Sequence, residues 1–166
     1  EENRSFFEIP PMIDVALWEP EIPPNTGNVV RLCAATGAAL HLIGRLGFRL
    51  DDRSLRRAGL DYWRDVRVVH HPTLPDFEAA LQGRRVFCFS ARASTPYTRV
   101  HYGPGDCLLF GGESHGLPET VVQRYGERAL LIPMPAAKVR SLNLATAVGI
   151  ALYEGLRQLS PWGLAP

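Results

Sequence analysis

Residues 107–118 read CLLFGGESHGLP, an apolar run followed by two glycines, a polar turn and a proline. A continuous apolar run such as Cys107–Gly111 is typical of a strand covered on both faces. The glycines that end it let backbone groups approach a ligand closely, and a helix is expected over Pro118–Tyr125. The stretch therefore predicts a strand, a ligand-binding turn and a helix in succession, as in an α/β fold.

The same succession recurs along the chain. We expect strands at Met12–Trp18, Leu40–Ile43, Val66–His70, Val86–Ser90, Cys107–Gly111 and Ala129–Ile132. We expect helices at Asn28–Thr36, Asp52–Ala58, Leu74–Leu81, Pro118–Tyr125 and Leu142–Leu159. Strands that alternate with helices favour an α/β fold, with a mostly parallel six-stranded sheet and helices on both faces. In the last helix Ala147, Gly149 and Ala151 form a small surface suited to close packing against another helix.

The chain has 166 residues, 46% of them hydrophobic, which fits one domain with a real core. We expect that domain over residues 12–160, after an irregular extension over 1–11 and before a tail over 161–166. No segment has the roughly 18 apolar residues in succession that would cross a bilayer, so we expect no membrane contact. The first residues lack the pattern of a secretory signal, which favours the cytoplasm.

The three cysteines, Cys33, Cys88 and Cys107, each lie in an apolar run and have no metal-ligand spacing. We interpret them as small buried hydrophobic residues and expect no metal. The net charge of +1 is too small to indicate a polyanionic partner. Charge is nevertheless concentrated, because seven arginines lie between Arg45 and Arg67. These arginines form either a solvated face or a surface that contacts RNA.

Three loops follow expected strands at the edge where open parallel sheets bind ligands. The first, residues 22–32, reads IPPNTGNVVRL. Asn25 and Thr26 are residue types that cap helices, and Asn28 and Arg31 would share a helix face. This loop is either a capped helix start with a surface arginine or part of a site.

The second loop is the glycine-rich turn after residue 110. Its Glu113 would engage a ligand or tie neighbouring loops together, whereas His115 reads as an incidental turn residue. The turn fits neither the dinucleotide nor the ATP-binding glycine pattern. In the third loop, Pro133 and Pro135 hold an extended backbone suited to an adenine edge, and Ser141 is a candidate cap for the last helix.

The segments NTGNVVRL, LLFGGESHGLP and IPM...RSLNLATAVGIALYE, in this order, closely resemble the three motifs of SPOUT methyltransferases that modify ribose 2'-hydroxyls. The further segments EPEIPPNTGNVVRLCAATG, LGF and RRAGLDYW resemble the small tRNA (cytidine or uridine) 2'-O-methyltransferases that act on the anticodon wobble nucleotide. The resemblance covers the chain from Met12 to about Leu159.

The resemblance implies a C-terminal deep trefoil knot, which general topology rules would exclude. It also implies S-adenosylmethionine as the cofactor, S-adenosylhomocysteine as the product, and a homodimer whose site uses both subunits. Carried over position by position, the cofactor-binding residues are Phe89, Ser90, Gly111, Ile132, Met134, Ser141 and Leu142. The small face of the last helix is compatible with a dimer contact.

The resemblance places four residues at the reaction itself: Arg31, with Asn28 beside it, and Glu113 and Asn143 in support. Free arginine has a pKa above about 12 and is rarely deprotonated. We therefore expect Arg31 to orient the 2'-hydroxyl and stabilise developing oxyanion charge, with the proton passing to phosphate or water. The alternative, in which Arg31 accepts the proton itself, also makes it essential.

The implied substrate, a tRNA anticodon stem-loop, favours RNA contact for the arginine-rich stretch. We expect Arg56 and Arg57 to bind RNA, with Tyr62, Trp63 and Tyr153 as candidates for base stacking. Alternatives are methylation at another tRNA or rRNA site, a SPOUT protein that binds RNA without catalysis, and a nucleotide-dependent enzyme such as an oxidoreductase. Relatives that modify other sites usually carry extra RNA-binding segments, so the short chain favours the wobble position.

Overall fold

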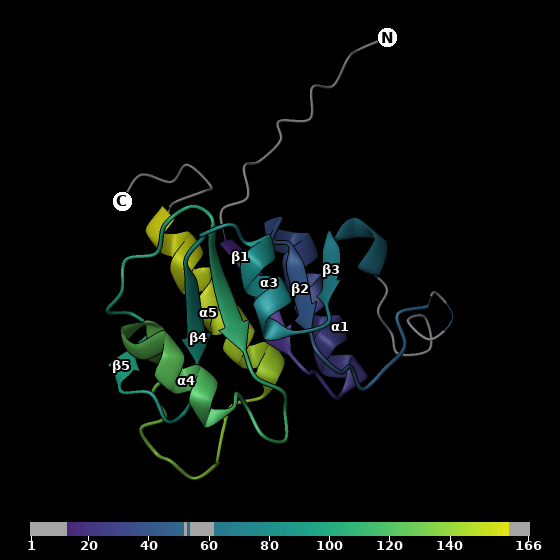
Figure 1. The fold of residues 1–166 in the computed structure, drawn as a ribbon. Helices are drawn as coiled ribbons and strands as arrows, with labels where there is room; N and C mark the ends of the chain where they lie inside the picture. The colour runs from purple at the N-terminus through teal and green to yellow at the C-terminus, as the bar shows by residue number, and fades with distance from the viewer. Residues whose placement is uncertain (1–12, 52, 54–61, 160–166) are drawn as a thin grey trace.

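The computed structural model describes residues 13–51, 53 and 62–159. They form a sheet with helices on both faces (Figure 1). The elements in chain order are β1 (Ile13–Trp18), α1 (Pro23–Thr36), β2 (Leu40–Ile43), η1 (Trp63–Asp65), β3 (Val68–His71), α3 (Leu74–Ala80), β4 (Val86–Phe89), β5 (Thr95–Pro96), β6 (Asp106–Phe110), α4 (Glu119–Tyr125), η2 (Gly126–Arg128), β7 (Ala129–Leu131) and α5 (Leu144–Leu159).

Seven strands form one sheet in the order β3-β2-β1-β6-β4-β7-β5, and every pairing between them is parallel. The α/β class and the parallel sheet are therefore confirmed. The expectation of six strands was wrong, because β5 adds a seventh. This strand has two half-buried residues, one of them a proline, and pairs only with β7, so no apolar run marks it in the sequence.

The inner strands are apolar because they face a helix layer on both sides. On β1, Ile13, Val15 and Leu17 belong to the core cluster that includes residues of α1 and α5. Ala16 between them faces the opposite cluster, which includes residues of α3 and α4. Near-continuous hydrophobicity is the pattern expected of parallel strands buried on both faces.

Helix α1 begins at Pro23, five residues before the expected start at Asn28. Proline is tolerated in the first turn of a helix because the amide hydrogen that it lacks has no partner there. The two prolines therefore open the helix instead of preceding it. The helix ends at Gly37, whose φ of 78° is readily adopted by glycine.

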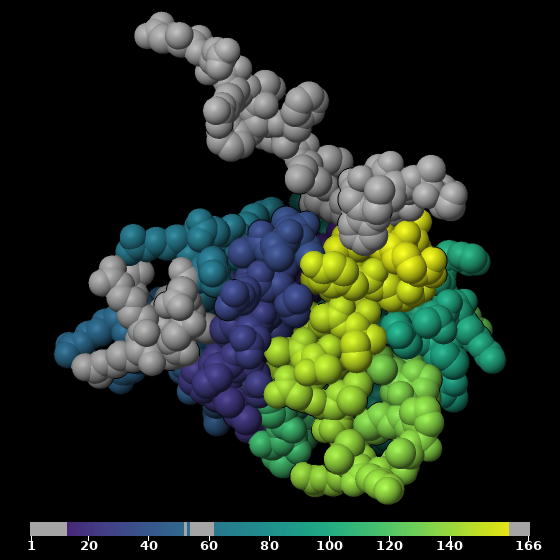
Figure 2. All heavy atoms as spheres, turned by 180° about the vertical axis from the view of Figure 1, so that it is seen from behind, coloured from purple at the N-terminus to yellow at the C-terminus, as the bar shows by residue number. Residues whose placement is uncertain are grey.

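Helix α5 lies beside α1 on one face of the molecule (Figure 2). A Cβ added at Gly149 would lie 3.6 Å from Leu32 of α1, and Ala151 is fully buried. The small residues of α5 thus pack within the chain, as the sequence suggested for a helix partner. The extension over 1–11 and the tail over 161–166 lie outside the described residues, as does the helix expected over Asp52–Ala58 apart from Arg53.

Candidate functional site

A cavity of about 770 Å³ opens beyond the carboxyl ends of β4, β6 and β7. This is the edge where parallel sheets bind ligands, and the volume is that of a small-molecule site. Its wall combines the segments after these three strands with the start of α5. The residues that line it are Ile22, Asn25, Phe89–Arg92, Phe110–Leu117, Leu131, Ile132, Met134 and Arg140–Leu144, with Ala147.

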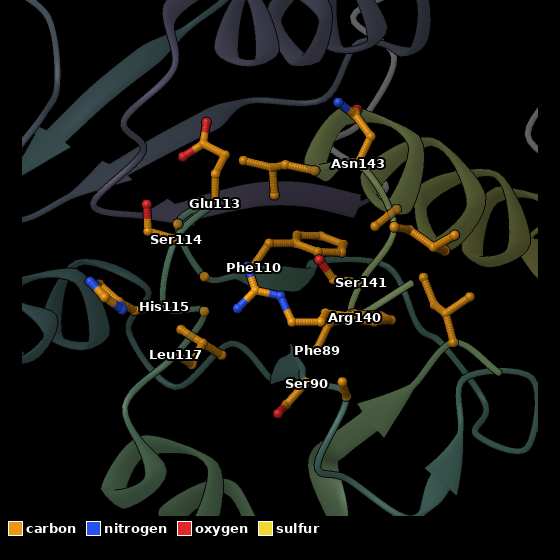
Figure 3. Close-up of a pocket in the computed structure, with 18 of the residues that line it drawn as sticks. Phe89, Ser90, Phe110, Glu113, Ser114, His115, Leu117, Arg140, Ser141 and Asn143 are labelled. Carbon is orange, nitrogen blue, oxygen red and sulfur yellow. The ribbon is translucent and has the colours of Figure 1, made fainter. Parts of the chain in front are cut away.

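The floor of the cavity is aromatic. Phe89 and Phe110 are register partners on β4 and β6, and their rings stack with centroids 4.6 Å apart. Both are largely buried, and Figure 3 shows them in the middle of the pocket. A flat apolar floor of this kind suits a planar, weakly polar group such as a nucleobase.

The glycine-rich turn folds back on itself beside this floor. A Cβ at Gly111 would lie 2.1 Å from the carbonyl carbon of Gly116, so only glycine fits there. The amide of Gly116 donates to the carbonyl of Gly112 at 2.9 Å, and the φ of Gly116 is 64°. The turn is therefore held closed by its own backbone, with glycines where other residues would clash.

Glu113 ties this turn to the start of α1. Its carboxylate accepts hydrogen bonds from the amides of Glu21 at 2.8 Å and Ile22 at 3.0 Å, and from Nδ2 of Asn25 at 3.3 Å. A carboxylate is favourable near a helix N-terminus, where unpaired amides carry partial positive charge. Of the two roles suggested by the sequence, tying neighbouring loops is the one that these contacts show.

Asn143 joins the third loop to Asn25, which also contacts Glu113. Its Nδ2 donates to Oδ1 of Asn25 at 3.0 Å, while its Oδ1 accepts from the amide of Thr146 at 3.2 Å. Asn143 therefore caps α5, and the capping role considered for Ser141 is wrong. Asn25 does not cap α1 with its side chain either, because it bridges Glu113 and Asn143.

The cofactor-binding residues expected from the resemblance come together here. Phe89, Ser90, Gly111, Ile132, Met134, Ser141 and Leu142 all line the cavity, as do Glu113 and Asn143. Ser90 lies across the opening from Glu113 and Asn143 in Figure 3. Three loops that are far apart in the sequence thus form one site.

Arg31 and Asn28 are not among the residues that line this cavity. Both are exposed on α1, and the Arg31 guanidinium lies over the ring of Tyr62, 5.4 Å from its centroid. A single chain therefore does not bring these two residues to its own cavity, and their role at the reaction stays a prediction.

Of the expected RNA-binding residues, Tyr62 and Trp63 lie at η1 and Tyr153 lies on α5. Tyr62 and Tyr153 are 40% and 47% exposed, and one face of the Tyr62 ring is covered by the Arg31 guanidinium. Trp63 is partly buried and packs against the core, so it is less accessible. Arg56 and Arg57 lie outside the described residues.

Sequence reasoning missed Asn25 and Arg140 as residues of the site. The sequence suggests only a helix-capping role for Asn25, and it suggests no separate role for Arg140. The signal that could have found them is position, because the first turn of α1, with Asn25, follows β1 and the loop with Arg140 follows β7, both at the carboxyl edge of the sheet.

The cysteines are buried hydrophobic residues, as expected. Burial raises the pKa of the Cys33 thiol to about 12 and that of Cys88 to about 11, and it raises the pKa of Cys107 well above the ordinary value. Within the described ranges, no three His, Cys, Asp or Glu side chains are grouped to hold a metal ion. No helix in those ranges is long and apolar enough to span a membrane.

The chain is similar to proteins of known family. The model of the SpoU rRNA Methylase family matches residues 12–153. A tRNA (cytidine(34)-2'-O)-methyltransferase of Aeromonas hydrophila subsp. hydrophila is 47% identical over 149 residues, which cover 89% of this chain and 95% of that protein.

Two solved structures extend the likeness to the fold. One, concerned with the 2-OH methylation of C/U34 on tRNA, has a TM-score of 0.83 and 52% identity, covering 91% of this chain and 98% of that chain. The other, an AdoMet-bound rRNA methyltransferase from Sinorhizobium meliloti, has a TM-score of 0.74 and 26% identity, covering 89% and 57%. The resemblance seen in the sequence is confirmed, and the chain belongs to the SpoU rRNA methylase family.

Proposed function

We propose that this protein transfers a methyl group from S-adenosylmethionine to the ribose 2'-hydroxyl of the wobble nucleotide, a cytidine or uridine, in a tRNA anticodon stem-loop. The observation that carries the proposal is the convergence of three separate loops on one cavity. Relatives named for this reaction at 44–47% identity support the substrate. The AdoMet-bound relative supports the cofactor.

The cavity fits the cofactor in size and chemistry. Its volume, about 770 Å³, lies within the range for ligands of this size. The aromatic floor and Ile132, Met134 and Leu142 would hold the adenosine, and the closed glycine turn would let backbone groups reach polar atoms. We infer S-adenosylhomocysteine as the product and no metal, since the donor carries its own leaving group.

S-Adenosylmethionine, when bound, supplies both the methyl group and a positively charged leaving group. The residues of the chain then have to align the ribose and handle one proton. Glu113 and Asn143 hold the loops in register, Asn28 positions Arg31 or the ribose, and Arg31 orients the 2'-hydroxyl and stabilises its developing charge. The proton passes to phosphate or water.

A homodimer would complete the site. Arg31 and Asn28 are exposed on α1, outside the cavity of their own chain, so a second copy has to present them. Helices α1 and α5 lie side by side on one face, which offers a continuous surface for that contact (Figure 2). Tyr62, Trp63 and Tyr153, with Arg56 and Arg57, are proposed to contact the RNA, and the reaction is placed in the cytoplasm.

We also propose a trefoil knot in the C-terminal half. Strand β7 pairs with β4 and β5, yet the next helix, α5, packs against α1, β1 and β6. The chain therefore returns across the sheet after β7, past the turn that follows β6. That path is what a threaded loop requires.

The test of the function is methylation of a tRNA anticodon stem-loop with labelled S-adenosylmethionine, followed by mapping of the modified nucleotide. We expect 2'-O-methylation at the wobble position and its loss in Arg31→Ala. Methylation at another nucleotide would contradict the assigned site, and near-normal turnover of Arg31→Ala would contradict the assigned role.

Subunit mixing tests the shared site. Arg31→Ala and Ser141→Arg, which would block the cavity, are each expected to be inactive alone. Mixed dimers contain one intact cavity facing one intact Arg31, so a 1:1 mixture should regain about a quarter of wild-type activity. A mixture that stays inactive would contradict the arrangement in which Arg31 acts across the dimer.

A further inference from the structure

Arg140 is a charged side chain of the cavity that the proposed reaction does not yet use. It precedes the Ser141–Asn143 segment, lines the cavity and is exposed to it. In Figure 3 its side chain extends from its loop into the pocket, toward the side that carries His115 and Leu117. Its guanidinium is therefore available to a ligand bound there.

The other Arg and Glu side chains of the lining already have partners. Glu113 accepts three hydrogen bonds. Arg92 pairs with Glu119 at 2.6 Å and donates to the carbonyl of Leu117 at 2.8 Å. Arg140 has no hydrogen bond or ion pair with any residue in the described part of the chain.

A guanidinium without a partner in a concave site is suited to an anionic oxygen group. Its planar fork matches the two oxygens of a carboxylate or phosphate, and such paired hydrogen bonds are among the stronger ones in proteins. The reaction proposed above brings both kinds of group to this place. One is the amino-acid carboxylate of the cofactor, and the other is a phosphate beside the target ribose.

We infer that Arg140 is the residue of this cavity that binds an anionic oxygen group, either the cofactor carboxylate or an RNA phosphate. This inference rests on the proposed function. Arg140 follows the extended loop and directly precedes two of the cofactor-lining residues, Ser141 and Leu142, so its reach covers the place where the donor and the ribose must meet.

The experiment compares Arg140→Gln with wild type by calorimetry, using two probes. One is S-adenosylhomocysteine, and the other is its decarboxylated analogue, which keeps the adenosine and the amino group. The matched control is Lys138→Gln, which removes one charge from the same loop at an exposed residue outside the cavity lining. The affinity for the tRNA stem-loop is measured as a function of salt on the same proteins.

If the anion is the carboxylate, Arg140→Gln should weaken S-adenosylhomocysteine by about 10- to 100-fold and leave the analogue unchanged. If it is a phosphate, both probes should bind as before, tRNA should bind about tenfold more weakly, and the slope of log affinity against log salt should fall by about 0.7 to 0.9. Either result supports the inference, provided that Lys138→Gln does not reproduce it.

Equal weakening of both probes would overturn the inference, since Arg140 would then act through the shape of the cavity. Unchanged affinity for every ligand would also overturn it. Wild-type protein that binds neither S-adenosylhomocysteine nor tRNA would contradict the proposed function as well. Normal wild-type binding with either of the first two results would contradict the Arg140 assignment alone.

Discussion

Asn143 donates a hydrogen bond from Nδ2 to Oδ1 of Asn25 at 3.0 Å, which joins the start of α5 to the first turn of α1. The same Asn25 side chain donates to Glu113 at 3.3 Å. The Asn25 amide thus joins its own segment to two others, 88 and 118 residues further along the chain. Asn25 is the residue through which the loops of the cavity hold each other in place.

We expect Asn25→Ala to weaken S-adenosylhomocysteine binding about tenfold, because two hydrogen bonds that fix the cavity wall are lost together. Calorimetry measures the effect. Gln123→Ala is the control, since Gln123 carries the same amide group, is exposed on α4 and does not line the cavity. We expect its cofactor affinity to stay within about twofold of wild type. Equal losses in the two variants would contradict the bridging role of Asn25.

Glu113→Gln tests the carboxylate that accepts from the backbone of two residues. The substitution keeps the shape but turns one acceptor into a donor, which then faces the amide of Glu21 or Ile22. We expect the free energy of unfolding to fall by about 1 to 3 kcal/mol. Urea denaturation measures it, and Glu127→Gln, at an exposed site, should stay within about 0.5 kcal/mol of wild type. An unchanged free energy of unfolding in Glu113→Gln would show that the hydrogen bonds of Glu113 contribute nothing to stability.

The glycine turn makes a sharper prediction about shape. Gly111→Ala should abolish cofactor binding and lower the melting temperature, because the added Cβ would lie 2.1 Å from the backbone of Gly116. Gly103→Ala is the control, since the nearest atom to its Cβ would be 3.6 Å away in Arg85, an ordinary van der Waals distance. We expect it to melt and bind like wild type. Normal binding by Gly111→Ala would mean that the turn opens at little cost.

The sequence predicts the sheet well because its strands are buried on both faces and carry continuous apolar runs. It misses β5 because two half-buried residues with a proline make no such run. The start of α1 is misplaced for a similar reason, since Pro23 and Pro24 also suit an extended approach. Local patterns therefore identify elements reliably only where burial repeats over several residues.

The site was predicted only in part. The cofactor residues were carried over from matching motifs, and all of them line the cavity. The role of Asn25 depends on contacts with residues 88 and 118 positions away, which no local pattern contains. Arg140 could not be told apart from Arg92 as the cation available to a ligand, because the pairing of Arg92 with Glu119 is a tertiary contact that the sequence does not show.

A cluster of buried polar side chains lies away from the cavity, on the neighbouring strands β1, β2 and β3, and consists of Asp14, His41 and His71. Nδ1 of His41 lies 2.9 Å from Nε2 of His71, and Nε2 of His41 lies 3.6 Å from Asp14. Both imidazoles are buried and pack on the ring of Phe77. The nearby carboxylate favours a proton on Nε2 of His41, so His71 donates to its Nδ1. Despite burial, the nearby His41 ring and hydrogen bonds from Arg84 and the Ala39 amide lower the pKa of Asp14.

Because of this cluster, we expect the protein to lose stability in mild acid. Burial, together with His41 and His70 and against Asp76, lowers the pKa of His71 below its ordinary 6.5 in the folded protein. The unfolded chain therefore binds a proton more readily, so the contribution of His71 is complete above about pH 6.5 and is lost as the pH falls toward the folded-state pKa. Urea denaturation at pH 8 and pH 5 measures the free energy of unfolding, which should drop less between these pH values in His71→Gln than in wild type. His101→Gln, at an exposed histidine, should keep the full drop, and an undiminished drop in His71→Gln would refute the assignment.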